Sequence, residues 1–186
     1  MQIKNLHFDV LSESEILFHV NSIEESREFS SILFKVLEPG MSIGLSGELG
    51  VGKTELVRLL LEKFSLASQV ISPSFILEVE YLLPEVSQKI HNIRRFYHWD
   101  LYRLKKTNQH LPELEERLHD IEAITFVEWF EYVYNIRDLL SIEIMISFVV
   151  NKEAYGEEFA FEQQRQITCK FNNVEINRRL YNILGI

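Results

Sequence analysis

The sequence predicts an α/β fold of three layers with a mixed sheet at the centre. One observation is that apolar, strand-like runs alternate with amphipathic helical stretches. Another is that the apolar runs 96–101 and 123–127 end at or beside an acidic residue, Asp100 or Glu128. The third is a match to G-x-x-x-x-G-K-[ST], formed by Gly47, Glu48, Leu49, Gly50, Val51, Gly52, Lys53 and Thr54. This pattern between a strand and a helix is typical of a P-loop, so we predict a P-loop NTPase-like fold.

The first elements are defined by their caps and stops. Residues 16–20 (Ile-Leu-Phe-His-Val) predict a strand. Asn21 or Ser22 is a good N-cap for a helix that runs to about Leu37. Residues 38–40 (Glu-Pro-Gly) end that helix, since neither Pro nor Gly continues one well.

Apolar periodicity and turn residues define the later elements. They are expected, in order, as a strand at 41–46, the P-loop, a helix at 53–64, strands at 69–71, 75–81 and 96–101, a helix at 111–120, a strand at 123–127, a helix or turn at 129–134, strands at 141–150 and 158–170, and a helix at 173–184. Pro112 marks a helix start. Residues 82–95 have little periodicity and predict an irregular excursion, and the last two strands predict a hairpin.

The P-loop residues predict a phosphate site. Glycine lets several backbone N–H groups turn toward a phosphate chain without a Cβ clash. Lys53 would place a positive charge near the outer phosphates, and the Thr54 hydroxyl is suited to ligate Mg²⁺. The helix that begins here favours anions at its N-terminus.

Two carboxylates are candidates for the metal site. Glu128 follows Ala-Ile-Thr-Phe-Val as a Walker B acid follows its strand, and Asp100 also lies near a strand end. We expect at least one of them at the metal, and their positions leave open which is closer. Ser74 in Ser72-Pro73-Ser74 could act as a switch-loop hydroxyl or simply form a turn. The six histidines show no metal-ligand spacing, and His98 is of interest only because it neighbours Asp100.

Composition bounds the organisation and the partners. The 186 residues predict a single P-loop domain, with a core at about 15–150 and a tail at 151–186 whose role the sequence does not indicate. A net charge of −9 disfavours direct binding of nucleic acid by this chain alone. The chain has no run of membrane-spanning length and no signal peptide, and its single cysteine, Cys169, suits a reducing cytoplasm. Cys169 is expected to be a small core residue.

The nucleotide is expected to be ATP. Guanine readers use Asn-Lys-x-Asp, in which the Asp accepts hydrogen bonds from the guanine edge. The corresponding residues here are Asn151-Lys152-Glu153-Ala154, so the purine-reading carboxylate is missing.

Several motifs in this order resemble the TsaE (YjeE) family, over roughly residues 15–150. They are Gly-Glu-Leu-Gly-Val-Gly-Lys-Thr (47–54), Ser-Pro-Ser-Phe-Ile-Leu (72–77), Tyr81, His-Trp-Asp-Leu-Tyr-Arg-Leu (98–104) and Val-Glu-Trp (127–129). The resemblance implies a slow ATPase that acts on a TsaD–TsaB complex in bacterial tRNA threonylcarbamoyladenosine biosynthesis, and so meets tRNA only through its partners. It also implies that Lys53 and Thr54 bind phosphate and Mg²⁺.

The same resemblance implies roles for four further residues. Glu128 would be the Walker B-like acid, Asp100 would serve a metal water or the attacking water, Ser74 would be the switch hydroxyl, and Trp129 would support the site. Glu55 departs from the family pattern and adds negative charge beside the P-loop.

Two other function classes stay open at this point. A small-molecule or nucleoside kinase could use Arg94, Arg95 and Arg103 to clamp a transferring phosphate. A nucleotide-gated interaction module with little catalysis would account for Glu55.

Overall fold

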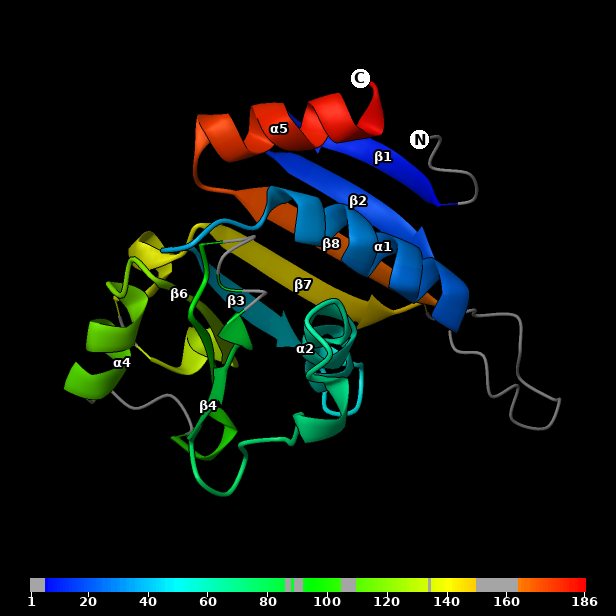
Figure 1. Cartoon of the computed structure of the whole chain (residues 1–186). Coiled ribbons are helices and arrows are strands. Elements are labelled where there is room, and N and C mark those ends of the chain that lie inside the picture. The colour runs from blue at the N-terminus through cyan, green and yellow to red at the C-terminus, as the bar shows by residue number, and fades with distance from the viewer. Residues whose placement is uncertain (1–5, 86–87, 89–91, 105–109, 134, 150–163) are drawn as a thin grey trace, which may run out of the picture.

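The computed structural model describes residues 6–85, 88, 92–104, 110–133, 135–149 and 164–186. Within them, eight strands form one sheet in the order β1-β2-β8-β7-β3-β6-β5-β4 (Figure 1). The strands are β1 (His7–Ser12), β2 (Glu15–Val20), β3 (Ser42–Gly47), β4 (Glu78–Leu82), β5 (Arg95–Asp100), β6 (Ala123–Glu128), β7 (Ile142–Phe148) and β8 (Arg165–Phe171).

The sheet is mixed, as the sequence predicts. Strand β3 pairs in parallel with β6 and β7, and β5 pairs in parallel with β6. The remaining neighbours, including β7 with β8, are antiparallel. The carboxyl ends of β3, β5 and β6 therefore meet at one edge of the sheet, where α/β folds bind ligands.

Helices cover both faces of the sheet, though unequally. Helices α1 (Ile23–Val36), α2 (Lys53–Glu62) and α5 (Val174–Leu184) pack with the larger apolar core on one face (Figure 1). The short helix α4 (Pro112–Leu118) packs on the other face against β5 and β6, with a second core that includes Leu114 and Val127. The alternation of side chains along β5 and β6 supplies both cores, because successive residues of a strand point to opposite faces.

Short 3₁₀ turns link these elements. They are Ala67–Gln69, Tyr102–Leu104, Phe130–Tyr132 and Arg137–Leu139. Among the described helices, we find none with the length and apolar character that crossing a bilayer requires.

Most predicted elements are confirmed, with local corrections. The strand at 69–71 is wrong, because a 3₁₀ turn at Ala67–Gln69 occupies this connection. The strand at 75–81 begins only at Glu78, since a turn at 74–76 precedes it. Strand β1 was not predicted and lies at the sheet edge.

Some predictions fall wholly or partly outside the described residues. They are the Asn-Lys-x-Ala segment at 151–154, the beginning of the strand at 158–170, part of the excursion at 82–95, the last residue of the strand at 141–150, and the last residue of the helix or turn at 129–134. The predicted hairpin is confirmed for the part that is described, since β7 pairs with β8. Cys169 is buried in the main core, as expected.

Candidate functional site

The P-loop connects β3 to α2, and glycine makes its backbone path possible. Gly47 has φ of +131°, and a Cβ at this position would lie 2.1 Å from the Ile146 carbonyl oxygen. Gly52, the N-cap of α2, has φ of +115°. Residues with a Cβ rarely adopt either conformation. The chain thus turns sharply from strand to helix, and the free N–H groups at the start of α2 lie beside a cleft that Gly50 and Gly52 line.

Lys53 is held inside the P-loop. Its side chain is almost fully buried, and Nζ donates hydrogen bonds to the carbonyl oxygens of Gly47 at 2.8 Å and Glu48 at 2.9 Å. The ammonium also lies 3.8 Å from the ring centroid of Trp129. Burial lowers the pKa of Lys53, and the nearby carboxylates of Glu128 and others partly oppose this effect. A cation is therefore positioned in advance where an anion could enter the cleft.

The two predicted acids lie side by side. Asp100 and Glu128 are partners in the parallel register of β5 and β6, and both are buried, at 2% and 3% exposure. Leu45 of β3 is the register partner of Glu128 on the other side, which places this carboxylate beside the P-loop. The structure therefore brings both acids to the cleft.

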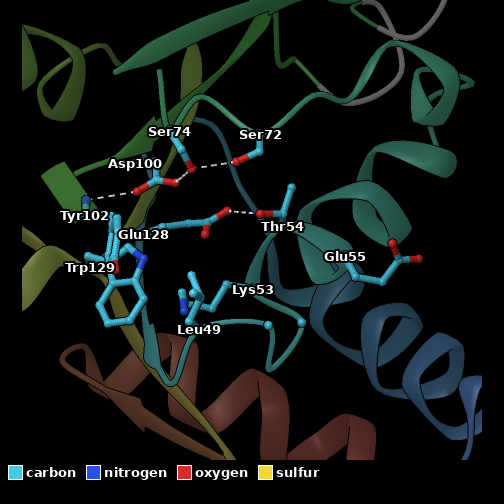
Figure 2. A pocket seen from close by; sticks show the side chains of 12 residues that line it. Leu49, Lys53, Thr54, Glu55, Ser72, Ser74, Asp100, Tyr102, Glu128 and Trp129 are labelled. Atoms are coloured by element: carbon cyan, nitrogen blue, oxygen red, sulfur yellow. Dashed lines mark hydrogen bonds between the residues drawn. The ribbon is translucent and has the colours of Figure 1, made fainter. Parts of the chain in front are cut away.

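Glu128 joins the P-loop helix to strand β5. Its Oε1 accepts a hydrogen bond from the Thr54 hydroxyl at 2.7 Å (Figure 2). The same oxygen lies 2.8 Å from Nε2 of His98. His98 is completely buried, and its Nδ1 has no partner among the described residues. A carboxylate only accepts hydrogen bonds, so this geometry assigns the His98 proton to Nε2.

Asp100 is joined to the Ser72–Ser74 turn. Ser74 donates a hydrogen bond to Oδ2 of Asp100, and the Ser72 and Ser74 hydroxyls are 2.8 Å apart (Figure 2). The other carboxylate oxygen, Oδ1, accepts a hydrogen bond from the Tyr102 backbone N–H at 2.9 Å. The Ser72–Ser74 turn, which is far from Asp100 in sequence, is thus hydrogen-bonded to the Asp100 carboxylate.

Trp129 has an unusual backbone conformation. Its φ of 59° lies in the left-handed region, and its N–H donates to the Leu45 carbonyl oxygen at 2.8 Å. A non-glycine residue in this region costs on the order of 1 kcal/mol or more. The turn directs the indole over Lys53, so the strain positions a side chain within the cleft.

The donor set fits a hard divalent cation. The hydroxyl of Thr54 and the carboxylates of Asp100 and Glu128 are oxygen ligands of the kind that Mg²⁺ prefers. Among the described residues, Asp100 has no ion pair and Glu128 has one only with His98, while the Lys53 ammonium acts on both carboxylates without a direct ion pair. Two buried carboxylates that share one such cation are costly unless a further cation or a proton compensates them.

The predicted residues differ in how they meet the cleft. Its lining includes Leu49, Gly50, Gly52, Lys53, Thr54, Ser74, Asp100 and Glu128. Gly47 and Glu48 contribute carbonyl oxygens to Lys53, whereas the Val51 side chain is buried in the core.

Sequence reasoning missed two contacts. Strand period indicates that His98 shares a face with Asp100, but only the register of β5 on β6 brings His98 to Glu128. Arg165 of β8 donates from Nε to the Val51 carbonyl oxygen at 2.8 Å, and no local signal relates these residues.

Comparisons with known proteins agree on one family. The family model described as "Threonylcarbamoyl adenosine biosynthesis protein TsaE" matches residues 20–158. A "tRNA threonylcarbamoyladenosine biosynthesis protein TsaE" of Rickettsia bellii (strain RML369-C) is 32% identical over 132 residues, 70% of this chain and 85% of the relative. The protein of the same description from Rickettsia prowazekii (strain Madrid E) is 28% identical over 150 residues, 77% of this chain and 96% of the relative.

A solved structure supports the fold. The structure described as "Crystal structure of Bacillus subtilus YdiB" superposes with a TM-score of 0.61 and 20% identity. The match covers 92% of this chain and 94% of that chain. It supports the predicted P-loop NTPase-like α/β fold.

Proposed function

The chain belongs to the TsaE family of threonylcarbamoyladenosine biosynthesis proteins, and from this premise we propose that it is a Mg²⁺-dependent ATPase that acts on a TsaD–TsaB complex. One observation carries the proposal. The P-loop residues Lys53 and Thr54 share a cleft with two buried carboxylates, Asp100 and Glu128. This combination of phosphate cradle and strand-end acids is the arrangement that phosphoryl transfer requires.

In this proposal each residue has a distinct role. The loop at 47–54 surrounds the phosphates of ATP, and Lys53 neutralises charge on the outer ones. Thr54 and Glu128 hold the Mg²⁺, which would stabilise the developing charge on the phosphate oxygens. Asp100 orients a metal-bound water or the attacking water. Ser74 acts as the switch hydroxyl, because its hydrogen bond couples the loop that carries it to the Asp100 carboxylate.

The competing function classes have less support. Arg95 begins β5 and Arg94 precedes it, whereas Asp100 ends the strand, so neither arginine clamps a phosphate at the cleft without a large movement. Both are also ion-paired, Arg94 with Glu122 and Arg95 with Glu80. The kinase hypothesis thus loses two of its three arginines.

The hypothesis of a nucleotide-gated interaction module rests on Glu55. The carboxylate of this residue does not face Asp100 and Glu128. Glu55 is ion-paired with Arg58, and in Figure 2 its carboxylate points away from Glu128. The Arg58 guanidinium partly offsets the negative charge that this residue adds beside the P-loop.

Apolar side chains around the cleft support a protein partner. Leu49 of the P-loop is 71% exposed, and Phe75 beside Ser74 is 81% exposed. Ile71 and Ile76 are exposed as well, so the segment that carries Ser74 is apolar on its outside. Exposed apolar patches of this kind mark interaction sites. We therefore propose that TsaD–TsaB contacts these exposed apolar residues at the edge of the cleft. The net charge of −9 disfavours direct binding of tRNA by this chain, so we propose that the partners hold the tRNA.

The proposed location is the cytoplasm, where this pathway would have access to tRNA. A single cysteine, buried and reduced, is compatible with a reducing compartment.

Phosphate release from ATP tests the proposal. We expect slow, Mg²⁺-dependent release by the protein alone and stimulation by added TsaD–TsaB. Thr54→Ala and Glu128→Ala should abolish release, whereas Thr54→Ser, which keeps the hydroxyl, should retain most of it. Wild-type rates in both alanine variants would overturn the site assignment. Transfer of phosphate to a metabolite rather than to water would favour the kinase, and nucleotide binding without turnover would favour the gated module.

A further inference from the structure

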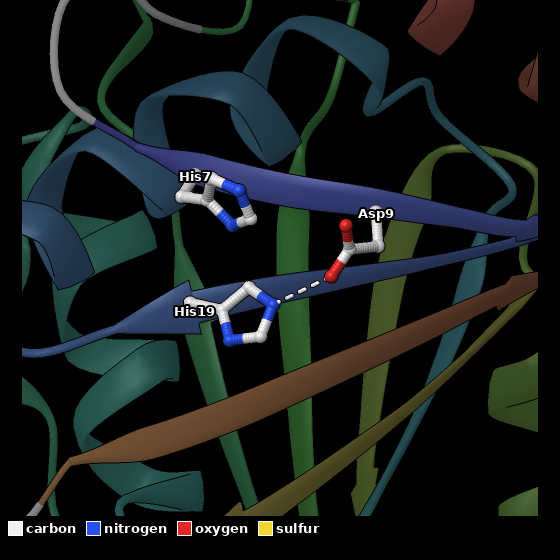
Figure 3. Close-up of side chains that lie close together, drawn as sticks. All are labelled: His7, Asp9 and His19. Atoms are coloured by element: carbon white, nitrogen blue, oxygen red, sulfur yellow. Dashed lines mark hydrogen bonds and ion pairs between the residues drawn. The ribbon is translucent and has the colours of Figure 1, made fainter.

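Two histidines and an aspartate gather on the outer strands, far from the cleft. His7 and Asp9 lie on β1 and His19 lies on β2 (Figure 3). We call these three residues the β1–β2 cluster. His7 is the direct register partner of His19, and Asp9 follows two residues later on the same face of β1. The pairing of the strands therefore brings together His7 and Asp9 with a histidine that lies twelve residues after His7 in the sequence.

The ligand atoms of the β1–β2 cluster converge. One nitrogen from each histidine and one oxygen from Asp9 all lie within 4.8 Å of one another. Nε2 of His19 is 2.8 Å from Oδ2 of Asp9, and the two imidazole rings are 4.8 Å apart between centroids. A tetrahedral metal with bonds of about 2.0–2.1 Å needs ligand atoms about 3.4 Å apart. Small side-chain rotations bring the set to that spacing.

The backbone beneath the cluster is rigid, and its outer side is open. Phe18 and Ile16 of β2 are fully buried on the opposite face of the strand, which holds the register of β1 on β2. His7 and Asp9 are exposed and His19 is partly exposed, on the face of the sheet opposite α1 and α5. Water can therefore complete the coordination of a bound metal.

We propose that His7, Asp9 and His19 form a binding site for a divalent transition metal, Zn²⁺ foremost. Two imidazoles and one carboxylate are a ligand set for Zn²⁺ and its first-row neighbours, whereas Mg²⁺ and Ca²⁺ prefer oxygen ligands. The cation replaces the His19–Asp9 hydrogen bond with bonds from both strands. Its structural effect is to fasten the edge strand β1 to β2.

The site is separate from the cleft of the proposed ATPase. Four strand spacings separate β1 from β3, which corresponds to roughly 19 Å. The β1–β2 cluster and the cleft share no residue. Metal binding at the β1–β2 cluster can therefore be measured independently of ATP hydrolysis at the cleft.

The alternative is that the cluster is only a cross-strand pair between His19 and Asp9, with His7 a neighbour. Such a pair would not need His7 and would have no preference among divalent cations. The two possibilities thus differ in the role of His7 and in metal selectivity.

Calorimetric titration of the full chain, with any affinity tag removed and with metals stripped by a chelator, distinguishes them. We expect Zn²⁺ to bind with one equivalent in the absence of nucleotide and to raise the thermal unfolding midpoint. His7→Ala and His19→Ala should each weaken binding at least tenfold and remove the thermal shift. His110→Ala, at an exposed histidine outside the cluster, is the matched control and should bind as the wild type does.

A second readout does not depend on the stability of any variant. Titration with Co²⁺ should give the visible absorption of a nitrogen- and oxygen-ligated ion, and His7→Gln, which keeps the size and polarity of the side chain, should lose it. Unchanged Zn²⁺ affinity in His7→Ala and His19→Ala would overturn the proposal. Mg²⁺ binding of equal affinity that is likewise lost in His7→Ala and His19→Ala would overturn it as well.

Discussion

Replacing His98 with phenylalanine tests how the fold holds Glu128. The variant keeps a buried aromatic ring and removes the Nε2–H that faces the Glu128 carboxylate at 2.8 Å. Both residues are at most 3% exposed, so water cannot replace the lost donor. A hydrogen bond to a charged group contributes about 1.5–3 kcal/mol, and the unfolding free energy should fall by about that amount. The thermal midpoint should then fall by about 3–12 °C for a chain of this size.

A double-mutant cycle separates the hydrogen bond from the packing of the ring. In a Glu128→Gln background the acceptor is neutral, so His98→Phe should cost only about 0.5–1.5 kcal/mol plus any packing difference. The coupling energy between the two positions should therefore be about 1–2 kcal/mol, measured by urea unfolding. His110→Phe, at an exposed histidine, is the control and should change stability by no more than about 0.5 kcal/mol.

Equal costs of His98→Phe in both backgrounds would show that the Nε2–H of His98 does not stabilise the Glu128 carboxylate. A coupling energy below about 0.3 kcal/mol would mean that the His98 ring matters only for packing. A functional readout accompanies the stability measurement. If Glu128 holds the metal as proposed, loss of its buried partner should lower ATP turnover by about 10–100-fold, as for other residues that orient metal ligands.

Three further predictions concern the P-loop and the core. Gly47→Ala should destabilise the protein by about 3 kcal/mol or more in urea unfolding, because its Cβ would meet the Ile146 carbonyl oxygen. Gly50→Ala is the control: a Cβ there meets nothing within 4 Å, so the substitution should cost only about 1–2 kcal/mol for its positive φ. Burial raises the pKa of the Cys169 thiol, so a disulfide reagent at about pH 8 should label it only after unfolding, and equally fast labelling of the native protein would contradict this. Burial lowers the pKa of Lys53 in the folded protein. Between that lowered pKa and the unfolded value of about 10.4, the unfolded chain binds more protons than the native protein does. The unfolding free energy of the wild type relative to Lys53→Met should therefore rise with pH across this window. A flat difference between the two proteins would show that Lys53 is not desolvated.

The strand–loop–helix at the centre of the protein could be predicted because its signals are local. A P-loop is a continuous segment, so the glycines, Lys53 and Thr54 identify it without knowledge of the rest of the chain. The acids Asp100 and Glu128 were predicted for a similar reason, since each ends an apolar run. Their catalytic and metal-binding roles, like the organisation of the chain as one domain, stay predictions.

Other parts depended on turn geometry that apolar runs do not show. The segment at 75–81 reads as a strand, yet the turn at 74–76 takes its first residues, and Ser74 then donates its hydrogen bond to Asp100. Strand β1 was missed because only one of its residues, Phe8, packs partly against the core, so its pattern is weak.

By itself the sequence determined the P-loop, the two strand-end acids and the family of the protein, because each is encoded in residues that are close together along the chain. Only the tertiary structure decided which side chains meet across strands. The order of β3, β6 and β5 places Glu128 between Thr54 and His98, and the register of β1 on β2 brings His7 to His19. Strand order and register come from pairing between distant segments and from burial of the sheet, and no local pattern contains them.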